Sequence, residues 1–162
     1  MKNIKSQISV EYLVIVGLAL AIIIPTSFLF YKYSQTSNEE AIRSQINKIG
    51  NSILTTSESV YGLGEGSVNT IELIYPKNIR DIEILNSEEL IIRYELNSGI
   101  SEDVFFSKIR ISGNYTNQDI EPRTFCSPPC SDSTLGPYFP AAGKHRIRFE
   151  SKNNYVLINT VN

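Results

Sequence analysis

The sequence predicts an α+β protein in which one long N-terminal helix packs, through its C-terminal half, against an antiparallel β-sheet head domain. Three observations support this prediction. The run from Tyr12 to Tyr31 contains no charged residue, isoleucines recur at helical spacing between residues 42 and 60, and apolar and polar residues alternate from residue 67 onward. A chain of 162 residues suffices for one main domain with an appendage.

The first expected element is an apolar helix long enough to cross a bilayer. The run YLVIVGLALAIIIPTSFLFY would span about 30 Å as a helix, the thickness of a hydrocarbon core. Lys2 and Lys5 precede it, so the positive-inside rule predicts a cytoplasmic N-terminus and an exported remainder. A secretory signal is the alternative. Its small-x-small site, Ala19-Leu20-Ala21, lies inside the run, so cleavage there would leave an insoluble end.

Two residues are unusual for a plain membrane anchor. Glu11 is a carboxylate beside the apolar run, and Pro25 removes a helical hydrogen bond within it. Each also has an ordinary explanation, because a carboxylate suits the first turn of a helix and membrane helices tolerate proline.

The segment Lys5-Ser6-Gln7-Ile8-Ser9-Val10-Glu11-Tyr12 resembles the Q-x-S-x-E-[YF] signature of archaeal class III signal peptides, found on type IV pilin-like proteins. Gln7, Ser9, Glu11 and Tyr12 match the signature, and the apolar run follows at once. A polar helical segment ending in Tyr61-Gly62-Leu63-Gly64-Glu65-Gly66, then a strand and Tyr75-Pro76-Lys77-Asn78, also looks like that family. The resemblance covers roughly the N-terminal half of the chain, and the distal half carries no recognisable motif.

The resemblance implies a precursor that a prepilin-peptidase-like membrane protease cuts between Ser6 and Gln7. Residues 1–6 would be the leader, and the mature chain would begin at Gln7 with Glu11 as its fifth residue. The family usually has Gly or Ala before the cut, where this chain has Ser6. The resemblance further implies a type IV pilin-like fold and a precursor in the cell membrane. An assembly ATPase and platform machinery would then build an extracellular filament from this chain or with other pilins, for adhesion or surface attachment.

Filament assembly would give three residues of this segment a role. An unpaired buried charge is costly, so Glu11 in a filament core needs a partner. In pilins that partner is the N-terminal amine of a neighbouring subunit, here the amine of Gln7. Pro25 would mark a place where the helix bends to fit its neighbours. The rival interpretation is a permanently membrane-anchored extracellular ligand-binding protein, in which Glu11 has no special role.

Beyond a transmembrane or filament-core segment, residues 7–33, the helical pattern continues as an amphipathic segment, residues 34–62. Residues on most of its faces are polar, and its apolar stripe is formed by Ile42, Ile46, Ile49, Ile53 and Val60. Gly62, Gly64 and Gly66 predict the end of the helix. We expect the stripe to be buried under the sheet of the same chain.

An extracellular β-rich head domain is expected over residues 67–162. The alternation predicts about six half-buried strands, around residues 71–75, 82–84, 92–96, 105–111, 147–149 and 155–161. Short turns without intervening helices favour antiparallel pairing. The acidic residues expected on solvent faces and turns are Asp81, Glu83, Glu88, Glu89, Glu102 and Asp103.

Residues 117–144 break the alternation, contain several prolines and predict a long exposed loop. Outside the cell, Cys126 and Cys130 would form a small disulfide there, with free thiols or a metal pair as the alternatives. Asn114 opens the N-glycosylation sequon Asn114-Tyr115-Thr116 and is expected to be exposed at a turn.

Composition and motifs argue against several classes of function. Fifteen Lys and Arg against 17 Asp and Glu, without a basic cluster, argue against nucleic-acid binding. One His and two Cys cannot build a four-ligand zinc site without carboxylates. His145 lies between Lys144 and Arg146 at the start of a strand and is expected on the surface. We therefore expect no enzyme, no cofactor and no metal site.

Overall fold

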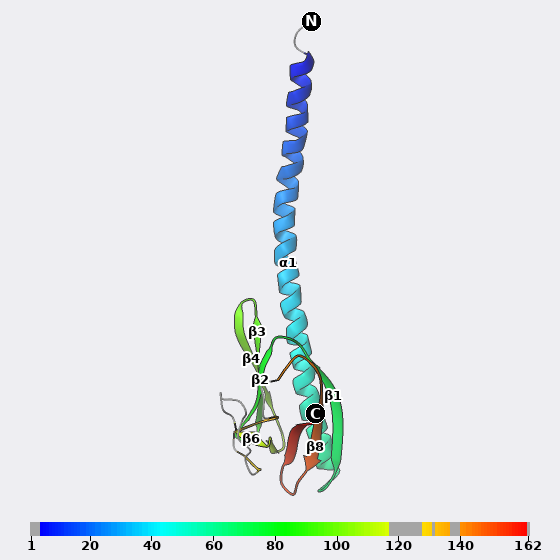
Figure 1. The fold of residues 1–162 in the computed structure, drawn as a ribbon, viewed down its shortest axis with the longest axis vertical. Helices are drawn as coiled ribbons and strands as arrows, with labels where there is room; N and C mark the ends of the chain where they lie inside the picture. The colour runs from blue at the N-terminus through cyan, green and yellow to red at the C-terminus, as the bar shows by residue number, and fades with distance from the viewer. Residues whose placement is uncertain (1–3, 117–127, 131, 137–139, 162) are drawn as a thin grey trace. The chain divides into compact units, whose positions relative to one another are not determined.

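The computed structural model describes residues 4–116, 128–130, 132–136 and 140–161. The chain divides into two units, Met1–Glu40 and Ala41–Asn162, which we describe separately. Within the described residues the elements are, in order, α1 (Ile4–Gly62), β1 (Val68–Tyr75), β2 (Ile79–Leu85), β3 (Glu89–Leu96), β4 (Gly99–Phe106), β5 (Ile111–Ser112), β6 (Tyr115–Thr116), β7 (Ser133–Thr134), β8 (Gly143–Ser151) and β9 (Val156–Val161) (Figure 1). The expected α+β class is confirmed.

The C-terminal end of α1 lies where the glycines predict it. Gly64 and Gly66 have φ angles of 96° and 83°, in the left-handed region that favours glycine. The Leu63 N–H donates to the Ser59 carbonyl oxygen at 3.2 Å, and the Gly66 N–H donates to the Ser151 carbonyl oxygen at 2.9 Å. The glycines therefore end the helix and form the turn before β1, which the Gly66 N–H attaches to Ser151.

The strands of the head form two sheets. Sheet A has the order β1-β8-β9-β5, and sheet B has the order β4-β3-β2-β7-β6. Within these sheets β5 and β9 pair in parallel, whereas the other pairings are antiparallel. The parallel pair is possible because the connection between β5 and β9 is long and passes through sheet B and β8.

Hairpins connect β2, β3 and β4, with the predicted turn residues at their tips. Asn86 and Ser87 have φ angles of 52° and 61°, and the Glu88 N–H donates to the Leu85 carbonyl oxygen at 3.1 Å, as in a type I′ turn. The single strand expected over residues 105–111 is wrong for residues 107–110, because β4 ends at Phe106 and β5 begins at Ile111. The Ser107 hydroxyl donates to the Ile109 carbonyl oxygen at 2.7 Å, a local bond that replaces the ladder.

The segment 117–144, expected to be an exposed loop, contains buried structure among its described residues. Ser133 and Thr134 form β7, which pairs with β2 and β6 and is fully buried. The Gly113 N–H donates to the Ser133 hydroxyl at 2.8 Å, so this backbone finds partners inside the head. Cys130 is buried, but Cys126 lies outside the described residues, and the disulfide stays a prediction.

The apolar stripe of α1 lies at the centre of the head, as expected. Ile46, Ile49, Ile53 and Val60 are buried, and Ile42 packs against them from the margin. The sheets contribute the remaining core side chains, chiefly Tyr75, Ile82, Ile84, Leu90, Ile92, Tyr94, Ile147, Phe149, Val156 and Ile158. Gly50 is also buried, and a Cβ atom there would collide with the Phe105 ring of β4.

Asp81 and Glu83 were expected on a solvent face, and this is wrong, since they are only 7% and 2% exposed. They lie on β2, an interior strand of sheet B that is covered on both faces. The Arg93 guanidinium lies 2.5 Å from the Glu83 carboxylate and 3.4 Å from that of Glu102. Burial raises the pKa of Glu83 above its ordinary value, and Asp81 raises this pKa further, whereas Arg93 opposes both effects.

Candidate membrane and assembly segment

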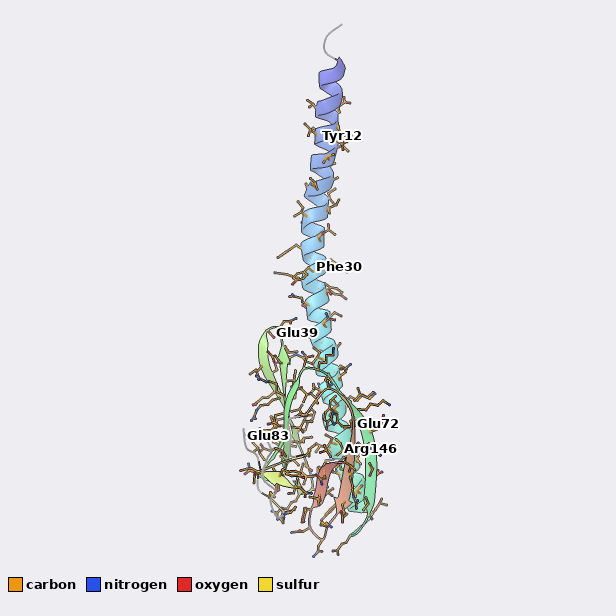
Figure 2. The ribbon with its side chains drawn as sticks, in the orientation of Figure 1. Tyr12, Phe30, Glu39, Glu72, Glu83 and Arg146 are labelled. Atoms are coloured by element: carbon orange, nitrogen blue, oxygen red, sulfur yellow. The ribbon has the colours of Figure 1, made fainter. Side chains whose placement is uncertain are left out.

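The N-terminal part of α1 carries apolar side chains around its whole circumference. Tyr12 and Phe30, near its two ends, are 68% and 72% exposed, and Figure 2 shows both projecting from the helix. Among the described residues, this helix alone is long and apolar enough to cross a membrane, and its apolar window has no buried residue. Such a surface needs lipid or other helices around it.

Glu11 is exposed on α1, directly before the apolar run. The backbone of residues 4–9 is already helical. The structure does not describe the side chains of these residues, which include Ser6, Gln7 and Ser9. Gln7 and Glu11 are four residues apart, so both belong to one face of the helix. The predicted cleavage site and the predicted assembly carboxylate are thus one helical turn apart.

Pro25 lies inside α1 and weakens its hydrogen-bond ladder. Proline has no N–H, so the Ala21 carbonyl oxygen lacks its usual helical donor. The Thr26 hydroxyl donates to the Ile22 carbonyl oxygen at 2.6 Å and binds the next carbonyl in the row. This turn presents the backbone acceptor that a neighbouring helix in lipid or in a filament can satisfy.

Aromatic rings and polar groups gather at the C-terminal end of the apolar run. The Lys32 ammonium lies 5.1 Å from the centroid of the Phe28 ring, and the Gln35 amide donates to the Tyr31 hydroxyl at 2.7 Å. Rings with a polar group at one end are typical of a membrane–water boundary. The composition therefore changes at the place where the sequence predicts the outer boundary.

His145 lies on β8 and is half-buried, with part of its side chain at the surface as expected. Its ring stacks on Tyr75 with centroids 4.5 Å apart, and its Nε2 lies 2.7 Å from the Ala141 carbonyl oxygen. Burial raises the pKa of Tyr75. No group of three or more His, Cys, Asp or Glu side chains that could hold a metal occurs in the part of the chain that the structure describes.

Asn114 was expected to be exposed at a turn, and this is wrong, because the residue is half-buried. Its Oδ1 atom is buried and accepts no hydrogen bond. The side chain lines a hollow of about 430 Å³ together with residues of β8 and β9, a feature that the sequence analysis missed.

Comparisons of this chain with protein-family models, with curated proteins and with solved structures found no match.

Proposed function

We propose that this chain is a structural subunit, a pilin, of an archaeal type IV surface filament. The precursor spans the cell membrane, and the processed chain assembles through its apolar N-terminal helix. The observation that carries this proposal is that the two parts of α1 differ in burial. The described core of the head begins at Ile42, whereas none of residues 12–31 is buried and none of them is charged.

Such a segment is costly in water. Burying one Leu, Ile or Phe side chain contributes about 1.5–3 kcal/mol, so a whole apolar helix needs a continuous apolar environment. Lipid supplies it before assembly, and helices of other copies supply it afterwards. A head-to-tail contact that does not close on itself then extends into a filament.

Glu11 supports assembly over simple anchoring. In the membrane the carboxylate lies at the edge of the apolar run, within reach of water. Between packed helices it would lose that water, and an unpaired buried charge is costly. The amine that cleavage creates at Gln7 of a neighbouring copy would neutralise it and would fix the axial register between subunits.

The N-terminus of the chain in sheared filaments tests processing. We expect the surface fraction from cells that make this protein to contain a chain that starts at Gln7, identified by peptide mass spectrometry. A chain found solely in membranes and retaining Met1 or Lys2 would contradict the proposal. The permanently anchored ligand-binding protein would then be the better account.

Replacing Glu11 tests assembly. Glu11→Ala should leave membrane insertion and cleavage unchanged but lower the yield of sheared filament about tenfold or more, since each tenfold corresponds to about 1.4 kcal/mol. Glu40→Ala is the matched control, because it removes the same charge from an exposed position beyond the apolar run. Equal filament yields from Glu11→Ala and the parent chain would refute the amine-pairing idea.

A further inference from the structure

The hollow beside Asn114 lies on the outer face of sheet A. Arg148 and Glu150 come from β8, and Leu157, Asn159 and Val161 come from the neighbouring β9. The register pairs Arg148 with Asn159 and Glu150 with Leu157, so these side chains share one face of the sheet. The alternate residues Ile147, Phe149 and Ile158 are buried in the core on the other face.

Two amide oxygens face this hollow without a hydrogen-bond partner. The Oδ1 atoms of Asn114 and Asn159 are both buried and unpaired, and both residues line the hollow. A buried acceptor without a donor costs about 1–3 kcal/mol, so a native fold rarely keeps two of them together. The pair therefore indicates a ligand that brings hydrogen-bond donors.

The remaining lining limits the chemistry of that ligand. The Arg148 guanidinium lies 3.5 Å from the Glu150 carboxylate, so the two charged groups of the lining offset one another. Leu157 and Val161 add apolar carbon surface. A ligand that fits this lining is neutral, has several hydroxyl groups and has an apolar face of C–H groups.

We propose that this hollow binds the hydroxyl groups of a saccharide. A hydroxyl both donates and accepts, so it can satisfy the amides of Asn114 and Asn159, the guanidinium and the carboxylate. The volume of about 430 Å³ falls in the range of small-molecule sites, about 300–1,000 Å³. The proposal is independent of filament assembly, because the described hollow belongs to a single chain.

Two other occupants fit less well. A metal cation would meet a single carboxylate, that of Glu150, and would lie close to the Arg148 guanidinium, whose charge repels it. Ordered waters can donate to the two amide oxygens, but they do not match the carbon surface of Leu157 and Val161. A saccharide both fills the space and supplies the missing donors.

The saccharide can come from two sources. Asn114 is the acceptor of the sequon Asn114-Tyr115-Thr116, so a glycan attached there would start at the rim of the hollow. A glycan from another molecule or surface has the same hydroxyl chemistry. Two substitutions of Thr116 distinguish these sources, because Thr116→Val removes the sequon and Thr116→Ser preserves it.

The test uses the full chain in detergent micelles, made in cells that glycosylate it and in bacteria that do not. The first measurement is glycopeptide mass spectrometry of residue 114. The second is the NMR side-chain amide signal of Asn159, compared between Thr116→Ser and Thr116→Val from the glycosylating cells. The third is titration of the bacterial chain with glucose, galactose, mannose and N-acetylglucosamine at millimolar concentrations.

Either of two results supports the proposal. A glycan on Asn114 that shifts the Asn159 signal in Thr116→Ser but not in Thr116→Val identifies the chain's own glycan as the occupant. A free sugar that shifts the signal of the unglycosylated chain identifies a foreign one. Asn159→Ala, followed through the backbone amide signal of residue 159, should then weaken that binding about tenfold, the loss of one good hydrogen bond. Asn153→Ala, at an exposed turn, should leave it unchanged.

The contrary result is equally definite. If no sugar moves the Asn159 signal, and a glycan on Asn114 is absent or leaves that signal unchanged, the hollow holds water and the proposal is wrong. This failure would not affect the filament proposal, which depends on the chain start at Gln7 and on Glu11.

Discussion

Ile53 tests whether the C-terminal part of α1 belongs to the head or is free to bind neighbouring subunits. Its side chain is fully buried within the core cluster. Ile53→Ala removes about three methylene equivalents, and at about 0.8 kcal/mol each the lost transfer energy is about 2.4 kcal/mol. The cavity adds to this loss, while the better helix propensity of Ala returns about 0.4 kcal/mol. We expect a net loss of about 3 kcal/mol in the free energy of unfolding.

The measurement is urea unfolding of the full chain in detergent micelles, followed by hydrogen exchange at the buried amides of Ile84 and Ile92. Thr55→Ala is the matched control on the same helix, because Thr55 is exposed and its truncation should cost less than about 0.5 kcal/mol. If Ile53→Ala costs no more than Thr55→Ala, the stripe is not the centre of the head. The assignment of this half of the helix to the intramolecular core would then be wrong.

Two further predictions concern the interior of the head. Because the pKa of Glu83 is raised on folding, its contribution to stability is full below the unfolded pKa and is lost as the pH rises through the folded one. Glu83→Gln cannot ionise, so urea unfolding should show it gaining stability relative to the parent chain as the pH rises above about 4, the unfolded pKa of Glu. A relative loss would mean that the Arg93 ion pair dominates. Gly113→Ala should lower the free energy of unfolding by about 1–3 kcal/mol, because its Cβ would overlap the Thr134 carbonyl oxygen. Gly62→Ala meets open space and should stay within about 0.5 kcal/mol, and equal unfolding midpoints would contradict this reasoning.

The parts of the fold that depend on local sequence could be predicted. The stripe from Ile42 to Val60 follows the helical period, so its buried face was evident before the structure. Glycine adopts left-handed backbone more readily than other residues, so Gly64 and Gly66 predicted the end of α1. The positions of Glu11 and Pro25 next to and within the apolar run are local features of the same kind.

The parts that depend on distant residues could not be predicted. Alternation places Asp81 and Glu83 opposite Ile82 and Ile84, but it cannot distinguish a solvent face from a second covered face. The pairing of β5 with β9 leaves no periodic signal, and neither does the division into two sheets.

The hollow shows the same limit for a candidate site. Arg148 and Asn159 face each other through the β8–β9 register, and Asn114 follows β5, which pairs with β9. Asn and Arg usually lie on the surface, so none of the three residues indicates a binding site in the sequence. The unpaired amide oxygens are visible only when the strands are in place.

The strand order of sheet A also has a consequence that we expect for the order of folding. The β2–β3–β4 hairpins pair residues that are close in the chain, so they can form early. In contrast, β1 must wait for β8, whose residue Glu150 pairs with Val68, and β5 must wait for β9. Closing such long loops is slow, because chain entropy is lost before the distant contacts form. While the chain emerges, we therefore expect the stripe on α1 to stay partly uncovered until β8 and β9 arrive, an interval that exposes the chain to proteases and aggregation.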